Sequence, residues 1–275
     1  MFDNVSDIGS FAGAVLEEVE TEDKRSTRCA LSGKGKDASS RALEDTDAAF
    51  FCKDGVPRRL GIMGGTFDPI HLGHLNCAER AMEALGLDGV LFIPAGDPAF
   101  KQDRDIASTE ARLAMCELAV ADNPSFCVSD IEIRRHGITY TVDTLEHLRA
   151  AYGADVEFVF IIGADSLLTL SDWKDASRLA SLANFACVSR PGYEVDPEIV
   201  NGLCEAGFHI EFVKAPMFDI SSSEVRALCK AGSSIRYLVP YAIRAFITQY
   251  GLYGDERGEG RPKIDFEGSD TEWMY

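Results

Sequence analysis

The sequence predicts an α/β fold in which helices cover both faces of a doubly wound, mostly parallel sheet. Two observations predict it. Short apolar runs of strand length alternate with runs of helical spacing across residues 57–253, which is the pattern of a parallel sheet. The short runs are also apolar at nearly every position, as expected for strands that are buried on both faces.

The expected elements follow one another along the chain. Strands are expected in six apolar runs, at residues 59–65, 89–96, 126–133, 157–165, 184–191 and 209–216. Helices are expected at residues 74–86, 108–122, 141–153, 172–183, 196–207 and 221–232. Two helix starts carry local signals, because Asp196 precedes Pro197 as an N-cap acid and Ser221 with Glu224 matches a capping box.

The two ends of the chain differ from its middle. Residues 1–56 are rich in acidic, polar and small residues, and residues 254–275 form a similar acidic tail. Such composition cannot bury enough apolar surface to fold alone. We therefore expect a flexible, disordered N-terminal extension, one folded domain at 57–253 and a flexible C-terminal tail.

Composition and charge narrow the class of protein. The formal net charge is −18, with 46% hydrophobic and 26% charged residues, so no general attraction to nucleic acid or anionic membranes is expected. No apolar run approaches the ~20 residues that cross a bilayer, and the N-terminus has no secretory pattern. A cytoplasmic protein is expected. None of the eight cysteines forms a CxxC pair, so we expect small buried hydrophobic side chains rather than a zinc site or disulfides.

The stretch GIMGGTFDPIHLGHL, residues 61–75, is the first candidate for chemistry. In doubly wound folds ligands bind beyond the carboxyl ends of the strands. If the first strand ends near Met63 and the helix starts around Gly73 or His74, the glycine turn exposes backbone N–H groups and the helix N-terminus adds its own. His71 and His74 can then face one anion. A metal site or a purely structural role is the alternative, although a zinc site needs a third ligand.

A second candidate is FDISSSEVRALCKAG, residues 218–232. Ser221, Ser222 and Ser223 supply hydroxyl and N–H groups at a helix N-terminus, and Arg226 can bridge phosphate oxygens as a planar fork. A capping box alone would explain Ser221 and Glu224 but not the three serines or the arginine. We therefore expect a second phosphate site about 150 residues after the first.

Together the two segments resemble the hallmarks of the HxGH nucleotidyltransferase superfamily, GGTFDPIHLGHL for the first and ISS(S/T)xxR for the second. The superfamily has a Rossmann-like fold and includes the class I aminoacyl-tRNA synthetases, so these hallmarks do not give the substrate. The resemblance implies a catalytic set of His71, His74, Lys101 and Arg226. It implies an ATP and phosphate site of Gly64, Gly65, Thr66, Phe67, Gly163, Asp165, Ile220, Ser221, Ser222 and Ser223.

Four further segments resemble the bacterial nicotinate-nucleotide adenylyltransferases. They are FIPAGDPAFKQD (92–103), SDIEIRRHGITYTVDTL (129–145), FIIGADSLLTLSDWKD (160–175) and SIRYLVPYAIRAFITQYGLY (234–253). With the two hallmarks they cover about residues 58–253. The family commonly has Pro-Pro-His-Lys where this chain has Pro98-Ala99-Phe100-Lys101, which keeps the lysine but makes the loop less rigid and removes a polar ring.

This resemblance implies an enzyme of NAD biosynthesis that transfers the adenylyl group of ATP to nicotinate mononucleotide, giving deamido-NAD and pyrophosphate. Tyr140, Thr141 and Trp173 would bind the nicotinate nucleotide, with the indole stacked on the pyridine ring. Asp165 would accept hydrogen bonds from the ATP ribose. Mg²⁺ would arrive with ATP, and no resident metal is expected.

Several alternatives stay open at this point. The acceptor could be nicotinamide mononucleotide or pantetheine phosphate, and the cytidylyltransferases share the first hallmark. A non-enzymatic nucleotide-binding module belongs to a different class, and a metal-dependent hydrolase is the weakest alternative. The sequence also leaves open whether the chain forms a homo-oligomer.

Overall fold

A computed structural model of the chain describes residues 58–98, 106–135, 137–189, 195–216 and 218–254. All of the predicted extension at 1–56, nearly all of the tail and the predicted catalytic residue Lys101 lie outside these ranges. Within them, six parallel strands form one sheet in the order β4-β2-β1-β6-β7-β8. The predicted doubly wound α/β fold is therefore confirmed.

The six strands match the predicted apolar runs. They are β1 (Arg59–Gly65), β2 (Gly89–Pro94), β4 (Phe126–Val128), β6 (Glu157–Gly163), β7 (Asn184–Ser189) and β8 (Ile210–Lys214). In the register of the sheet, Ile62 of β1 is opposite Leu91 on one side and Phe160 on the other. A small second sheet pairs β3 (Asp97–Pro98) with β5 (Ile138–Thr139), also in parallel.

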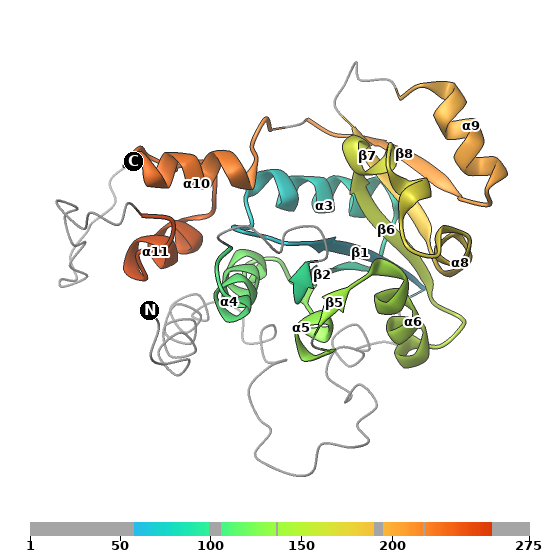
Figure 1. Ribbon diagram of the computed structural model, residues 1–275, viewed down its shortest axis with the longest axis horizontal. Helices are drawn as coiled ribbons and strands as arrows, with labels where there is room; N and C mark the ends of the chain where they lie inside the picture. The colour runs from blue at the N-terminus through green and yellow to red at the C-terminus, as the bar shows by residue number, and fades with distance from the viewer. Residues whose placement is uncertain (1–57, 99–105, 136, 190–194, 217, 255–275) are drawn as a thin grey trace, which may run out of the picture.

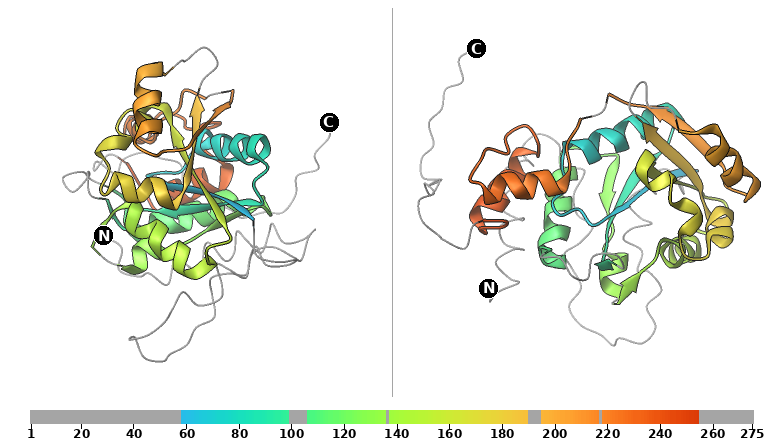
Figure 2. Two further views of the ribbon diagram at one scale, coloured as in Figure 1. Left: turned by 90° about the vertical axis from the view of Figure 1, so that its right-hand side faces the viewer. Right: turned by 45° about the horizontal axis from the view of Figure 1, so that its top comes forward.

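Helices cover both faces of the main sheet (Figures 1 and 2). They are α3 (Leu72–Leu85), α4 (Thr109–Val120), α5 (Ile131–Arg135), α6 (Thr141–Tyr152), α7 (Ala164–Leu167), α8 (Ala176–Leu182), α9 (Pro197–Glu205), α10 (Ser222–Lys230) and α11 (Tyr241–Gln249), with a 3-10 turn at Leu170–Asp172. The side chains of successive strand residues point to opposite faces of the sheet. Val90 and Phe92 pack with α3, α4, α10 and α11, whereas Leu91 and Ile93 pack with α6, α8 and α9.

Two predicted elements differ from the structure. The strand expected at 126–133 ends at Val128, and α5 follows. Ile131 and Ile133 alternate as strand residues do, but the N–H of Ile131 donates to Oγ of Ser129 and the chain turns into a helix. The helix expected at 172–183 begins only at Ala176, because Asp175 lies in the left-handed region with φ of 51°.

The other predicted boundaries are close. The first strand continues to Gly65, two residues past Met63, and the helix after it begins at Leu72. The cap signals are confirmed, since Asp196 accepts from the N–H of Glu198 at 2.9 Å and Ser221 from the N–H of Glu224 at 3.1 Å. Four of the six described cysteines are buried, but Cys204 is exposed. Among the described residues, the structure has no helix that is long and apolar enough to cross a membrane.

Candidate active site

Gly64 and Gly65 end β1, and the turn that follows them lies where the strand order of the sheet reverses. The chain runs from β1 to β2 and β4 on one side, then crosses to β6 on the other. A Cβ atom at Gly64 would lie 3.2 Å from the ring of Phe160, and one at Gly65 would lie 3.1 Å from the ring of Phe67. Both positions therefore favour glycine, and Gly64 leaves an exposed stretch of backbone that an anion can approach.

Thr66 and Phe67 continue this turn toward α3. Phe67 has a positive φ of 50°, and its ring is buried in the core. The ring meets His74 edge-on, with 5.1 Å between the ring centroids. Of the predicted phosphate-binding groups of Phe67, only the backbone remains available, because the side chain supports His74 from the core side.

His71 and His74 lie at the N-terminus of α3 and touch each other. The N–H of His71 donates to Nδ1 of His74 at 3.2 Å, so in a neutral His74 ring the proton is on Nε2. Burial lowers the pKa of His71 to about 4, which keeps its ring uncharged at neutral pH. Nδ1 of His71 is buried, with no hydrogen-bond partner among the described residues. A Cβ at Gly73 would lie 3.0 Å from that same Nδ1, so the glycine between the histidines makes room for the His71 ring.

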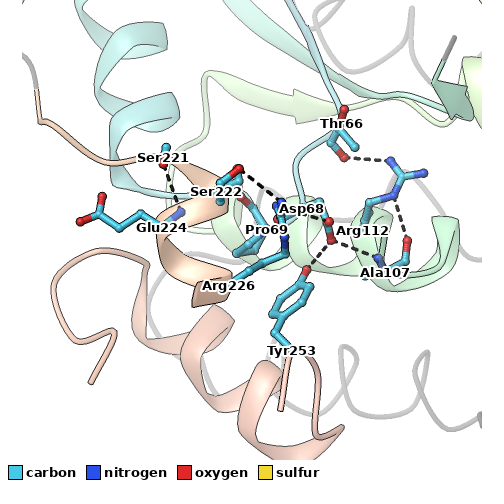
Figure 3. Close-up of polar contacts among 11 residues, drawn as sticks. Thr66, Asp68, Pro69, Ala107, Arg112, Ser221, Ser222, Glu224, Arg226 and Tyr253 are labelled. Carbon is cyan, nitrogen blue, oxygen red and sulfur yellow. Dashed lines mark hydrogen bonds and ion pairs between the residues drawn. The ribbon is translucent and has the colours of Figure 1, made fainter. Parts of the chain in front are cut away.

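The structure brings the second predicted phosphate segment onto the first. Oγ of Ser222 donates to the carbonyl of Pro69 at 2.9 Å, and Nη1 of Arg226 donates to the carbonyl of Asp68 at 2.6 Å (Figure 3). A Cβ at Gly73 would also lie 3.8 Å from the carbonyl oxygen of Ile220. The segments 64–74 and 220–226 therefore lie against each other at the N-termini of α3 and α10.

The three serine hydroxyls of that segment make hydrogen bonds within the protein. Ser221 caps α10, Ser222 donates to the loop after β1, and Ser223 accepts from Nη2 of Arg226 at 3.3 Å. The side chain of Arg226 is a quarter exposed. The segment thus offers an anion the N–H groups of a helix N-terminus and a partly exposed guanidinium, held in place by the serines.

Two of the predicted nicotinate-binding residues, Tyr140 and Trp173, pack against the same core cluster on one face of the sheet. Tyr140 is the N-cap of α6 and Thr141 its first residue. Nζ of Lys174, the residue after Trp173, lies 4.3 Å from the centre of the Tyr140 ring. The half-buried indole of Trp173 meets Phe160 edge-on, with 6.0 Å between the ring centroids.

Phe160 therefore connects the two halves of the site. Its ring, 5% exposed, lies between the backbone of Gly64 and the indole of Trp173. Gly163 and Asp165 follow Phe160 at the carboxyl end of β6, both exposed. Gly163 is the N-cap of α7 and Asp165 lies in its first turn, so Asp165 is not itself the cap.

Sequence reasoning missed a set of buried polar residues under the β1 turn. Arg112 is 1% exposed and donates through Nη1 to the carbonyl of Thr66 at 2.8 Å and through Nη2 to that of Gly96 at 3.1 Å. Asp68 is 2% exposed and accepts from the hydroxyl of Tyr253 at 2.6 Å. The signal for Arg112 was a charged residue inside the apolar helix TEARLAMCELAV. The signal for Asp68 was an acid beside the two histidines.

No group of three or more His, Cys, Asp or Glu side chains that could hold a metal ion occurs in the described parts of the chain.

Known proteins resemble this chain in sequence. The family model described as cytidylyltransferase-like matches residues 62–228. The chain is 45% identical over 197 residues to a protein of Herpetosiphon aurantiacus named "Probable nicotinate-nucleotide adenylyltransferase", which covers 71% of this chain and 98% of that protein. A protein of the same name from Trichlorobacter lovleyi is 46% identical over 211 residues, with 71% and 99% covered.

Solved structures share the fold. The Plasmodium falciparum nicotinic acid mononucleotide adenylyltransferase complexed with NaAD aligns with a TM-score of 0.60 at 20% identity, covering 71% of this chain and 97% of that one. The structure of the same enzyme complexed with APC aligns with a TM-score of 0.58 at 18% identity, with the same coverage. At these identities the likeness establishes the fold, and the closer sequence relatives establish the family. The chain therefore belongs to the cytidylyltransferase-like nucleotidyltransferases and, within them, to the nicotinate-nucleotide adenylyltransferases.

Proposed function

We propose that this chain transfers the adenylyl group of ATP to nicotinate mononucleotide, releasing pyrophosphate and forming deamido-NAD. The observation that carries the proposal is that the two segments predicted to bind phosphate, 64–74 and 220–226, contact each other, with the rings of Phe160 and Trp173 next to Gly64 of the first segment. ATP bound along the segments would present its α-phosphate next to a mononucleotide bound against Trp173. The relatives' name and the geometry point to the same reaction.

The reaction needs no protein nucleophile. An oxygen of the mononucleotide 5′-phosphate, already ionised at neutral pH, attacks the α-phosphorus of ATP. A new P–O bond forms between the two nucleotides as the bond between the α-phosphorus and its bridging oxygen breaks. The electron pair leaves with pyrophosphate. Catalysis then consists of positioning and of stabilising the charge that builds on the phosphates.

The described residues suit those two tasks. His74, with its proton on Nε2, would donate to the α-phosphate, and the neutral ring of His71 would contact the triphosphate without adding a charge. The backbone at Gly64, Gly65 and Thr66 would bind the reacting phosphates. Arg226 would bind the departing pyrophosphate with Lys101, which stays a prediction. The ATP enters as its Mg²⁺ complex, with the ion on phosphate oxygens and water.

The acceptor side would select for a carboxylate. Trp173 would stack on the pyridine ring, and Thr141 at the start of α6, beside Tyr140, would receive the nicotinate carboxylate near the helix N-terminus. An amide in that place would turn an NH₂ toward donors. Unpaired buried polar groups cost ~1–3 kcal/mol each, so the preference for the acid should be strong.

The test is pyrophosphate release from Mg²⁺-ATP with nicotinate mononucleotide or its amide, assayed in parallel. Strong preference for the acid supports the proposal. Equal or reversed preference would contradict the assigned acceptor and indicate an enzyme that uses nicotinamide mononucleotide. Pyrophosphate release with pantetheine phosphate alone would indicate a pantetheine-phosphate adenylyltransferase. A chain that binds ATP but releases no pyrophosphate with any acceptor would be a binding module.

A further inference from the structure

The segment 64–74, predicted to bind phosphate, contains a buried carboxylate, Asp68, and no role in the reaction accounts for it. Oδ1 of Asp68 accepts two hydrogen bonds, from the hydroxyl of Tyr253 at 2.6 Å and from the N–H of Ala107 at 3.2 Å. Oδ2 is buried and has no hydrogen-bond partner among the described residues, and it lies 3.5 Å from Nη1 of Arg226 (Figure 3). The carboxylate thus stands between a phenol and a guanidinium.

Tyr253 reaches this carboxylate from the far end of the domain. It lies 185 positions after Asp68 and adopts a positive φ of 59°, an uncommon conformation for a bulky residue. Such backbone strain persists only where the surroundings favour it. Burial and the neighbouring Asp68 raise the pKa of Tyr253, so the phenol keeps its proton and acts as the donor.

Arg226 contacts both the backbone and the side chain of Asp68. Nη1 of Arg226 donates to the backbone carbonyl of Asp68 at 2.6 Å, whereas the distance of 3.5 Å to Oδ2 is an ion pair without a hydrogen bond. A carboxylate and a guanidinium at this separation would otherwise favour two parallel hydrogen bonds. The phenol and the N–H of Ala107 hold Oδ1 on the opposite side, so that arrangement is not reached.

We propose that Tyr253 is a positioning residue that keeps the carboxylate of Asp68 from pairing fully with Arg226, which leaves the guanidinium available to the phosphates of ATP. Without the phenol, Asp68 rotates toward Arg226, forms the bidentate pair and competes with ATP for the same donors. The inference rests on the proposed function in one respect, because it takes the anion that Arg226 binds to be a nucleotide phosphate.

The first test is Tyr253→Phe, which removes one hydroxyl and keeps the ring. We expect the KM for ATP to rise on the order of tenfold, as for a weakened charge-assisted contact, while the KM for nicotinate mononucleotide changes less than about twofold. The matched control is Tyr237→Phe, because Tyr237 precedes α11 in the same C-terminal segment with 86% of its surface exposed. An unchanged KM for ATP in Tyr253→Phe would overturn the proposal, even if the melting temperature fell.

A second variant separates positioning from stability. Asp68→Asn removes the charge that competes for Arg226 and keeps an oxygen that can accept from Ala107. We therefore expect Asp68→Asn to bind ATP at least as tightly as the unmodified chain, and Tyr253→Phe with Asp68→Asn to regain most of the lost ATP affinity. A purely structural role predicts the reverse, since each change would remove another buried contact. Failure of this rescue, or weaker ATP binding in Asp68→Asn alone, contradicts the proposal.

Direct calorimetric binding of Mg²⁺-ATP distinguishes this inference from the proposed function. If the unmodified chain binds Mg²⁺-ATP but does not use nicotinate mononucleotide, the assigned reaction fails, and weaker Mg²⁺-ATP binding by Tyr253→Phe still supports the inference. If the chain turns over both substrates and Tyr253→Phe binds Mg²⁺-ATP normally, the reaction stands and the inference fails.

Discussion

The imidazole rings of His71 and His74 are stacked, with 3.7 Å between their centroids and 22° between their planes. The stack and the hydrogen bond from the N–H of His71 to Nδ1 of His74 fix the position of the His74 ring. Because burial keeps His71 neutral, the two rings do not repel each other as two cations would. The two residues therefore act together. The buried, uncharged ring of His71 supports the ring of His74, whose Nε2–H can donate a hydrogen bond to a phosphate.

Replacing His74 with alanine should slow the reaction without unfolding the protein. Loss of one preorganised donor to developing charge costs on the order of 10²-fold in kcat, and we expect at least that loss for His74→Ala. The matched control is His209→Ala, because His209 is exposed and precedes β8, away from the histidine pair. Steady-state kinetics with both substrates measures the effect. A His74→Ala enzyme with near-normal kcat would show that another group stabilises the α-phosphate.

Gly73→Ala should disturb the stacked pair of His71 and His74 by a steric clash alone. The new methyl group would lie 3.0 Å from Nδ1 and 3.1 Å from Cε1 of the buried His71 ring, so the ring must shift and the stack with His74 must change. We expect kcat to fall more than tenfold, a loss of ~1.4 kcal/mol or more in transition-state stabilisation.

The control for this change is Gly202→Ala in α9, where a Cβ meets nothing within 4 Å. That variant should keep its activity and gain about 0.5–1 kcal/mol in unfolding free energy, because alanine favours a helix. Equal activity of Gly73→Ala and the unmodified chain would show that the His71 ring tolerates displacement.

Sequence reasoning predicted the fold because the chain carries its information locally. The apolar run EFVFIIG and the helix signal at Asp196-Pro197 each identify an element without reference to distant residues. Because ligands of such sheets bind beyond the carboxyl ends of the strands, Gly64 and Gly65 could be chosen from the first strand and its turn. Gly163 came from the family resemblance, because the order of the strands in the sheet was not predicted.

Several of the missed features depend on contacts between residues that are distant in the sequence. The segment Ile131–Arg135 alternates like a strand, but Glu132 is buried as a helix residue that accepts from Oγ1 of Thr144 at 2.6 Å. The bond between Asp68 and Tyr253 joins residues 185 positions apart. No periodicity or spacing rule marks such pairs. The role of Lys101 lies outside the described residues and remains a prediction.

Trp173→Ala should weaken binding of the mononucleotide and leave ATP nearly unaffected. The indole meets Phe160 edge-on and is half-buried, so one part of it remains for a pyridine ring. Loss of an aromatic stacking partner costs ~1–3 kcal/mol, which predicts a KM for nicotinate mononucleotide raised by about tenfold or more. Trp173→Phe is the control, because it keeps a ring against Phe160 and should recover part of the affinity. If Trp173→Ala leaves that KM unchanged, the indole only packs on Phe160.

The stability of the protein should depend on pH through Glu117 in α4. Burial, with a smaller contribution from the nearby Asp130, raises the pKa of Glu117 to about 7 from an ordinary value of 4.5. Between those two values the folded chain binds this proton more tightly than the unfolded chain, so the free energy of unfolding falls as the pH rises through the window. We expect Glu117→Gln, which stays uncharged, to be more stable than the unmodified chain at pH 8 by on the order of 1–2 kcal/mol. At pH 4.5 the two should be nearly equal.

Urea unfolding at several pH values measures the difference, with Asp155→Asn in an exposed loop as the control for loss of one negative charge. If the difference between Glu117→Gln and the unmodified chain were independent of pH, Glu117 would ionise in the folded protein as it does in water.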